Sequence, residues 1–259
     1  NGLFCDGSET CDPALDCQAG TPPTIDDGVG CTDDSCDEVG DVIVNSPNNP
    51  TGTIIRKGEL QTFLRALPEN LMVLLDEAYG DFVDDPDWPD SLALGGGRPF
   101  IVLRSFSKIY GLAGLRVGFG VGPEDLIGYM NRTREPFNVN RLAQAAAAAA
   151  LGDEGYRRRA IEVVRRGRSD LYAAFDRLGL RYLESQANFI FLRVEEGDAV
   201  FEELMRRGVI VRPGSAFDCP EWVRVTVGLP EENRKLVEAL EKVGETGAEG
   251  PGERPIHLE

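Results

Sequence analysis

Short apolar runs alternate with segments of helical period from residue 41 to about residue 246 of this chain. Runs rich in Val, Ile, Leu and Phe predict buried strands, and apolar positions spaced by three and four predict amphipathic helices. The predicted strands are Val42–Asn45, Val73–Asp76, Ile101–Ser105, Arg116–Val121, Phe189–Arg193, Val209–Arg212 and Trp222–Val227. The predicted helices are Glu59–Ala66, Pro123–Thr133, Ala143–Leu151, Asp153–Leu178, Ala199–Arg207 and Glu231–Val243. This alternation is typical of an α/β fold.

Two of these helices have an unusual composition. Ala143–Leu151 is apolar apart from Gln144, which predicts a helix that packs closely against its neighbours. Asp153–Leu178 carries many arginines, and a nucleic-acid surface is one interpretation of them. Because Glu and Asp are interleaved with the arginines on an acidic chain, we expect a solvated helix face instead.

The first 40 residues differ from the rest of the chain. They lack aliphatic runs, and residues 1–45 hold eleven of the 44 acidic side chains but no Lys or Arg. Such a segment buries too little apolar area to fold unaided, so its cysteines are expected to cross-link it; these are Cys5, Cys11, Cys17, Cys31 and Cys36. Zinc is the alternative, but no C-x-x-C pair and no nearby histidine support it, and the Asp-rich turns lack the spacing of a calcium loop.

Composition therefore divides the chain into unlike parts. We expect an acidic cysteine-rich segment over 1–40, a large domain over 41–151, a linking helix with a small domain over 152–246, and a mobile polar tail over 247–259. The longest apolar runs are far too short to span a membrane. The net charge of −17 argues against a nucleic-acid partner.

Polar clusters follow three of the predicted strands, at the positions where α/β folds hold their ligands. They are Asn48–Gly52, Asp76–Tyr79 and Ser105–Arg116. Taken singly they could be a turn, a helix cap and a surface amine. In the third cluster, however, Lys108 lies among small hydroxyl residues with an arginine eight positions later. An amine in that setting can form a Schiff base with a cofactor aldehyde, while hydroxyls and a guanidinium can hold a phosphate.

In this order the clusters resemble fold-type I pyridoxal-phosphate-dependent aminotransferases, and among them the histidinol-phosphate aminotransferases. The motifs are Val42-Ile-Val-Asn-Ser-Pro-Asn-Asn-Pro-Thr-Gly, Leu75-Asp-Glu-Ala-Tyr, Ser105 to Arg116, Pro136-Phe-Asn-Val-Asn, Ser185-Gln-Ala-Asn-Phe, Gly208-Val-Ile-Val-Arg-Pro and Val223-Arg-Val-Thr-Val-Gly. The resemblance covers residues 41–246. It implies an incomplete large-domain sheet with helices, followed by an α+β small domain.

The resemblance also implies roles for individual residues. Lys108 matches the lysine that binds the cofactor aldehyde and moves the substrate proton. Asp76 matches the carboxylate that pairs with the pyridine nitrogen, and Asn49 and Tyr79 match the pair that bonds the ring oxygen. Three residues match the phosphate contacts, and two match or suggest contacts to the substrate's acidic group. The phosphate contacts are Ser105, Ser107 and Arg116, and the substrate contacts are Arg224 and Arg212.

The implied reaction is amino transfer between histidinol phosphate and 2-oxoglutarate, with glutamate as the paired amino acid, in a cytoplasmic homodimer. Aromatic aminotransferases and threonine-phosphate decarboxylase share much of the motif set and stay open. Residues 1–45 resemble instead a unit of the cysteine-rich repeats of large bacterial surface proteins, which would suit an extracellular segment. The family has a hundred residues or more before the Asn-Asn-Pro-Thr-Gly motif. We therefore predict a chimera whose pocket lacks its glycine-rich loop and stacked aromatic, and the alternative function is a secreted repeat fused to an inactive remnant.

Overall fold

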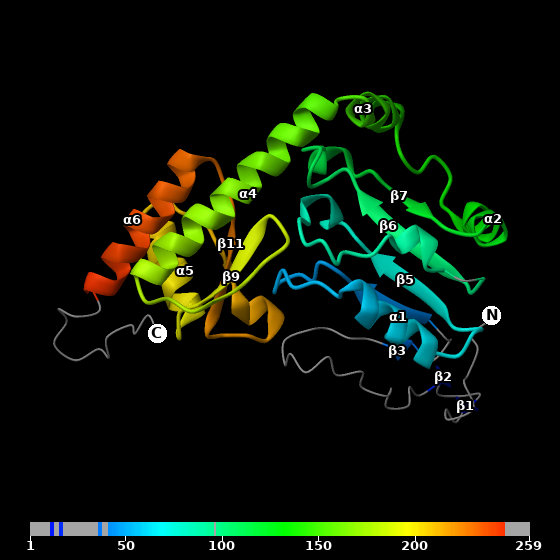
Figure 1. The fold of residues 1–259 in the computed structure, drawn as a ribbon, viewed down its shortest axis with the longest axis horizontal. Coiled ribbons are helices and arrows are strands. Elements are labelled where there is room, and N and C mark those ends of the chain that lie inside the picture. The colour runs from blue at the N-terminus through cyan, green and yellow to red at the C-terminus, as the bar shows by residue number, and fades with distance from the viewer. Residues whose placement is uncertain (1–10, 13–15, 18–35, 38–40, 96, 247–259) are drawn as a thin grey trace.

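Two larger sheets and the helices that cover them make up the computed structural model, which describes residues 11–12, 16–17, 36–37, 41–95 and 97–246 (Figure 1). The first sheet has the order β3-β4-β5-β6-β7. Its strands are β3 (Cys36–Asp37), β4 (Asp41–Asn45), β5 (Met72–Asp76), β6 (Phe100–Ser105) and β7 (Gly118–Val121). β4, β5 and β6 run parallel, whereas β3 and β7 pair antiparallel at the two edges.

One face of this sheet is covered by α1 (Lys57–Ala66). Leu60 and Leu64 lie on one side of α1 and pack against alternate residues of β4, β5 and β6. This is the crossover geometry expected between parallel strands. The other face is less covered, because Ile43, whose side chain alternates with those of Val42 and Val44, is 55% exposed.

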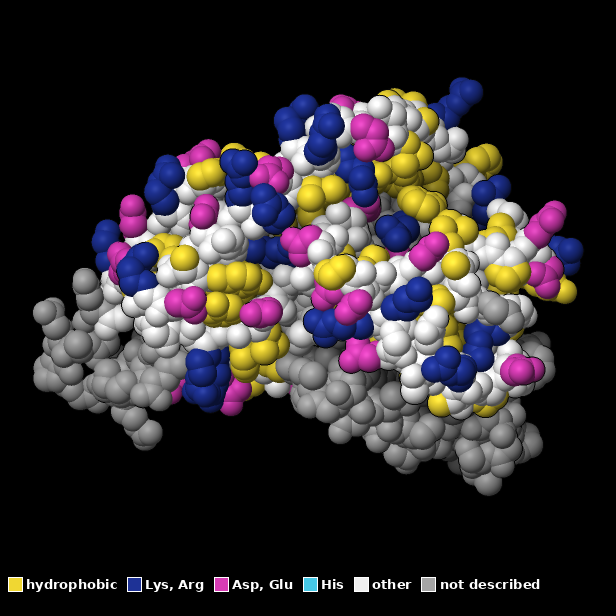
Figure 2. Space-filling view, viewed as in Figure 1, with side chains coloured by type: hydrophobic (Ala, Val, Ile, Leu, Met, Phe, Trp, Pro, Cys, Tyr) yellow, Lys and Arg dark blue, Asp and Glu magenta, His cyan; other side chains and the backbone are white. Residues whose placement is uncertain are grey.

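Two further helices, α2 (Glu124–Thr133) and α3 (Arg141–Leu151), follow β7. α2 buries none of its residues, and Leu142 of α3 is 77% exposed. The prediction of a tightly packed helix over Ala143–Leu151 is therefore wrong for most of its surface. Ala143 and Ala147 of α3 are buried and Ala150 packs partly against the same cluster, because α3 meets a neighbour along one stripe while Leu142 and Leu151 face outward. Hydrophobic side chains gather over this part of the molecule in Figure 2.

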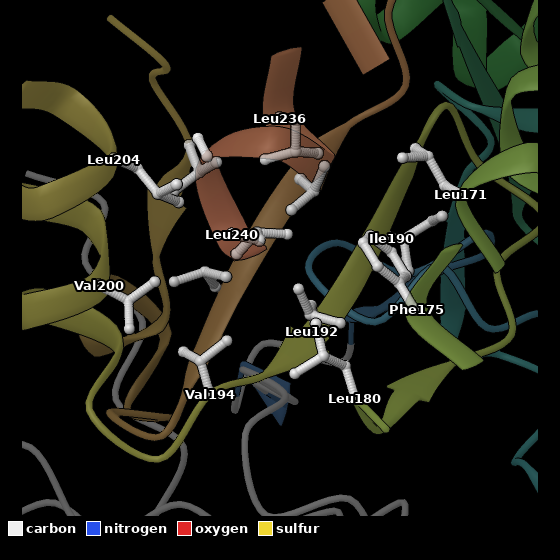
Figure 3. Close-up of a cluster of buried hydrophobic side chains, with 14 of the residues drawn as sticks. Leu171, Phe175, Leu180, Ile190, Leu192, Val194, Val200, Leu204, Leu236 and Leu240 are labelled. Carbon is white, nitrogen blue, oxygen red and sulfur yellow. The ribbon is translucent and has the colours of Figure 1, made fainter. Parts of the chain in front are cut away.

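The second sheet has the order β10-β11-β9-β8 and is antiparallel throughout. Its strands are β8 (Tyr182–Leu183), β9 (Phe189–Arg193), β10 (Arg212–Pro213) and β11 (Trp222–Thr226). It is packed with α4 (Glu154–Arg177), α5 (Gly197–Arg206) and α6 (Pro230–Thr246) around the core drawn in Figure 3. α4 is long, and in Figure 1 it runs from beside α3 to this second sheet.

Two predicted strands are shorter than expected. The predicted strand Arg116–Val121 begins only at Gly118, because residues 113–115 form a 3₁₀ turn and Arg116 is left-handed at φ 52°. Of Val209–Arg212 only Arg212 lies in a strand, paired with Arg224. Val209 and Val211 are apolar because they pack into the core of the second sheet, which is a reason independent of strand pairing.

The cysteine-rich segment is described only in part. Cys5 and Cys31 lie outside the described residues, while Cys11, Cys17 and Cys36 lie in two-residue strands: β1 (Cys11–Asp12), β2 (Asp16–Cys17) and β3. Its disulfides, the tail over 247–259 and the domain boundaries stay predictions. Within the described part of the chain, no helix is long and apolar enough to cross a membrane.

Candidate active site

The end of β5 places Asp76 and Tyr79 at the carboxyl edge of the parallel strands. The Asp76 Oδ1 accepts a hydrogen bond from the Ala78 amide at 2.8 Å, which turns the chain out of the strand. The adjoining main chain is held from both sides, since Ser46 N donates to the Asp76 carbonyl and Glu77 N donates to the Leu103 carbonyl. Asp76 therefore occupies a rigid position between neighbouring strands.

Lys108 lies in the turn after β6. Gly111 N donates to the Lys108 carbonyl at 3.1 Å, and Gly111 has φ +68°, a conformation that favours glycine. The Lys108 Nζ lies 4.8 Å from the centroid of the Tyr79 ring. The tyrosine ring, which is buried, thus brings the amine of one strand end to the end of the neighbouring strand.

Two hydroxyls and a guanidinium gather beside the lysine turn. Ser107 N donates to Ser105 Oγ at 3.1 Å, and the Arg116 Nη1 donates to Ser107 Oγ at 3.5 Å and to the Ala113 carbonyl at 3.0 Å. Arg116 holds the left-handed backbone conformation noted above, which costs on the order of 1–3 kcal/mol for a residue other than glycine. Hydroxyls and a guanidinium in this arrangement are chemically suited to a phosphate.

Arg224 of β11 reaches the loop after β4. Its Nη1 donates to Asn49 Oδ1, and the guanidinium lies 5.0 Å from the centroid of the Phe189 ring and 5.7 Å from that of Phe217. Burial lowers the pKa of Arg224, while the Nε is buried without a hydrogen-bond partner in the described residues. Arg212, which is exposed, is paired with Arg224 across the two strands, and its charge also lowers that pKa.

Phe189 joins these groups. Its ring meets the Tyr79 ring edge-on, with the centroids 5.0 Å apart. A continuous set of contacts therefore runs from Lys108 through Tyr79 and Phe189 to Arg224 and Asn49. The structure thereby brings together side chains from the large sheet and from the second sheet.

A hollow of about 420 Å³ lies between β5, β6 and β7. Asp76, Ser105 and Phe119 are among its lining residues. Ligand pockets are typically about 300–1,000 Å³ and combine apolar walls with a few polar groups. A carboxylate at one strand end with an amine, hydroxyls and a guanidinium at the next fits a planar heterocycle that carries a phosphate. None of the contacts given above joins Asp76 directly to Lys108.

One buried cluster was not predicted. Glu77 is fully buried, accepts a hydrogen bond from Ser91 Oγ, and pairs with the Arg104 Nη2 at 2.5 Å. Burial raises the pKa of the Glu77 carboxyl, and the Ser91 hydroxyl and Arg104 offset part of that rise. The sequence offered one signal, the charged residue directly after Asp76. Phe189 was part of a predicted motif, but its role as the bridging ring was not anticipated.

Comparison with known proteins covers the part of the chain that holds these residues. Residues 32–240 match the family described as aminotransferase class I and II. Histidinol-phosphate aminotransferase 1 of Nitrosococcus oceani is 50% identical over 204 residues, which cover 78% of this chain and 55% of the relative. Histidinol-phosphate aminotransferase 2 of Carboxydothermus hydrogenoformans is also 50% identical, covering 78% of this chain and 57% of the relative. The chain thus spans about half the length of these relatives.

Solved structures agree with this fold. The histidinol-phosphate aminotransferase of Sinorhizobium meliloti, in complex with pyridoxal-5'-phosphate, matches with a TM-score of 0.73 and 27% identity over 78% of this chain and 56% of that one. The L-threonine-O-3-phosphate decarboxylase of Porphyromonas gingivalis matches with a TM-score of 0.70 and 27% identity, covering 79% of this chain and 64% of that one. The fold is therefore part of the fold-type I architecture, as predicted.

Proposed function

This chain belongs to the aminotransferase class I and II family, and from that premise we propose that it catalyses pyridoxal-phosphate-dependent amino transfer between histidinol phosphate and 2-oxoglutarate. The observation that carries the proposal is the set of contacts from Lys108 through Tyr79 and Phe189 to Arg224. It joins an amine that can bind an aldehyde to a cation that can bind the acidic end of a substrate. The names of the relatives at 50% identity support the choice of amino donor.

The cofactor would be held from two strand ends. Lys108 would bind its aldehyde, Asp76 would hold a proton on the pyridine nitrogen, and Asn49 and Tyr79 would bond the ring oxygen. Ser105, Ser107 and Arg116 would bind its phosphate, consistent with their mutual contacts. When bound, pyridoxal phosphate supplies an electron sink for a carbanion at the substrate Cα. Lys108, released from the aldehyde by the incoming amine, would take the proton from that carbon.

The substrate's acidic group would meet Arg224 and Arg212. Two guanidiniums on paired strands favour an anion of more than one charge over a single carboxylate. This supports a phosphate-bearing amine. Threonine phosphate has the same feature, and the match to a threonine-phosphate decarboxylase makes that reaction the second candidate. Aromatic aminotransferases, which act on substrates without phosphate, would use the arginine pair less fully.

Cofactor titration tests the proposal. The purified chain mixed with pyridoxal phosphate should develop the absorbance band of a lysine-bound cofactor, and Lys108→Ala should abolish it. Lys57→Ala, which removes an exposed lysine at the start of α1, is the matched control and should leave the band intact. A wild-type chain that never develops the band would overturn the proposal and leave the inactive remnant as the better description.

Amino donors separate the candidate reactions. Histidinol phosphate with 2-oxoglutarate should yield glutamate, and this activity should fall at least tenfold in Arg224→Ala. Release of carbon dioxide from threonine phosphate would favour the decarboxylase instead, and activity on aromatic amino acids alone would favour the aromatic enzymes.

A homodimer in the cytoplasm is the assembly and location we propose for this enzyme. The exposed apolar side chains on and between β7, α2 and α3, among them Phe119, Tyr129, Phe137 and Leu142, support a self-association surface on the large sheet. Light scattering should give twice the chain mass of 28.3 kDa, and Leu142→Glu should return the mass to that of one chain. A monomeric wild type would contradict this part of the proposal.

A further inference from the structure

Arg168 is a deeply buried cation on α4, a helix whose other arginines are largely exposed. It is 4% exposed, and its Nη1 donates to the Ser185 carbonyl at 2.9 Å and to the Ala187 carbonyl at 3.3 Å. Its Nη2 donates to Asp84 Oδ2 at 3.0 Å. Asp84 belongs to the loop after β5 of the large sheet, whereas Ser185 and Ala187 lead into β9 of the second sheet. Arg168 therefore connects the two sheets from a third element.

The same place holds two further links between the sheets. Gln186 N donates to the Gly52 carbonyl at 2.8 Å, and Asp84 N donates to the Gln186 Oε1 at 2.9 Å. Gly52 packs so closely against Ser185 that a Cβ there would lie 2.1 Å from the Ser185 Oγ. We call these five residues the seam: Gly52, Asp84, Arg168, Ser185 and Gln186. Each of them contacts at least one of the others.

The seam leads directly into the candidate active site. Phe189, which meets the Tyr79 ring, begins β9 three residues after Gln186. Arg224 is paired across the ladder with Phe191 of β9, and its guanidinium lies over the Phe189 ring. A shift of the seam would therefore carry Phe189 and Arg224 away from Tyr79 and Lys108.

Burial of the Arg168 guanidinium removes its hydration, which destabilises the fold unless protein groups replace the lost hydrogen bonds. A buried ion must be paired and hydrogen-bonded to offset its lost hydration, and an apolar side chain of similar volume often gives equal stability. Arg168 satisfies two carbonyls and a carboxylate at once, with the directional geometry that only a guanidinium supplies. A fixed relative position of the two sheets requires hydrogen bonds of defined direction, and ionic attraction alone does not supply them.

We propose that Arg168 is a positioning residue, which acts through the seam to hold the substrate-binding Arg224 at its distance from Lys108. The functional half of this inference rests on the proposed aminotransferase activity, while the structural half does not. The seam holds before any ligand binds, and loss of Arg168 loosens it without unfolding the second sheet.

Amide hydrogen exchange, resolved by residue, tests the structural half without cofactor. In Arg168→Gln the Gln186 amide should exchange about 10- to 100-fold faster, as expected for loss of a charge-assisted contact. The Val194 amide, which donates to the Glu221 carbonyl just beyond the paired ends of β9 and β11, should be unchanged. Arg166→Gln, two residues away and exposed, is the matched control, and Arg168→Lys should fall between it and Arg168→Gln. Equal acceleration at Gln186 and Val194 would overturn the inference.

Asp84→Asn provides a second variant in case Arg168→Gln does not fold. Its side chain is 44% exposed, so the substitution leaves no buried gap, and it should accelerate Gln186 exchange in the same selective way. Unchanged exchange at Gln186 in a folded Asp84→Asn protein would contradict the proposed linkage.

The functional half is tested in the cofactor-loaded protein. Arg168→Gln should raise the KM for the phosphorylated amine about tenfold and leave the affinity for pyridoxal phosphate unchanged. Because Arg168 acts through Arg224, the effect should largely vanish in an Arg224→Ala background. Additive effects, or an equal loss of cofactor affinity, would overturn the positioning role. Failure of the wild type to bind cofactor would instead overturn the proposed function. The hydrogen-exchange experiment would still test whether Arg168 holds the seam together.

Discussion

The two sheets differ in how their apolar strands are covered. In β9 the side chains of Phe189 to Leu192 are buried on both faces of the sheet. In the large sheet, Ile43 of β4 is exposed on the face opposite α1, and all four residues of β7 are exposed. β4 and β9 each contain a run of consecutive apolar residues, so the difference between them lies in what packs on each sheet. The helices α4, α5 and α6 surround the second sheet, whereas α1 covers one face of the first.

The sheet with the larger buried core and the sheet that carries most of the candidate site are therefore not the same sheet. The residues proposed to bind the cofactor lie at or after the ends of strands of the less covered sheet, while the well-covered sheet contributes the arginines proposed to bind the substrate. The candidate site therefore depends on contact between a sheet that is well covered on one face and a second sheet with a larger buried core. The seam links the two sheets, as do the contacts of Phe189 with Tyr79 and of Arg224 with Asn49.

The largest expected effect compares one phenylalanine from each sheet. Phe191 is fully buried and stacks on Trp222 with the ring centroids 4.8 Å apart, whereas Phe119 of β7 is 43% exposed. Phe191→Ala should lower the free energy of unfolding by about 3–5 kcal/mol. Phe119→Ala should lower it by less than about 1.5 kcal/mol, since little apolar area is buried there. Urea titrations measure both, and equal losses would mean that β7 is covered in solution.

A smaller effect is expected at the seam. Gly52 and Gly208 have φ near +75°, but only Gly52 would clash on gaining a Cβ. Gly52→Ala should cost about 2–4 kcal/mol, from the left-handed conformation and from overpacking against Ser185. Gly208→Ala, with open space around it, should cost about 1 kcal/mol. The difference between the two losses of unfolding free energy measures the effect of the close contact between Gly52 and Ser185. Identical losses would show that the seam can shift to accept a Cβ at residue 52 without strain.

The third effect is a difference in pH dependence between the sheets. Burial raises the pKa of Glu77, so its contribution to stability is present below the unfolded value near 4.5 and is lost as pH rises through the folded value. Hydrogen bonds from Arg206 lower the pKa of Glu203 on α5, so its contribution is present above the unfolded pKa and is lost as pH falls.

Gln substitutions at these two glutamates should therefore tilt stability in opposite directions. The stability of wild type relative to Glu77→Gln should decline between acidic and neutral pH, with differences of at most about 1–3 kcal/mol. Relative to Glu203→Gln it should rise slightly over the same range. Thermal melts from pH 4 to 8 measure both trends, and a rising trend at Glu77 would contradict its raised pKa.

Much of the fold could be predicted because local patterns are strong in this chain. Apolar runs located β5, β6 and β9 to within one residue at each end, and helical periods located α4 and α5 to within two. The strand and packing predictions failed where an apolar residue is explained by something other than strand pairing or close helix packing. Val209 and Val211 pack in a core without strand pairing, and the alanines of α3 imply close packing only where a neighbour is present.

The sequence could nominate residues for the candidate site but not the contacts between them. Asp76, Tyr79 and Lys108 were recognisable because each lies in a polar cluster after a strand. Glu77 lies in one of these clusters, but neither its burial nor that of Arg168 can be read from the sequence, since a buried ionic group looks like any surface charge there. Their ion pairs join residues 27 and 84 positions apart, which no local pattern encodes.

By itself the sequence determined the α/β class, the order of the elements and the family, and it predicted the chemistry-bearing residues, because these depend on short-range periodicity and on local motifs. Only the tertiary structure decided which apolar faces are covered, that Phe189 bridges Tyr79 and Arg224, and that Arg168 joins the two sheets. The physical reason is that burial and ion pairing are properties of surroundings, and those surroundings come from segments far apart along the chain.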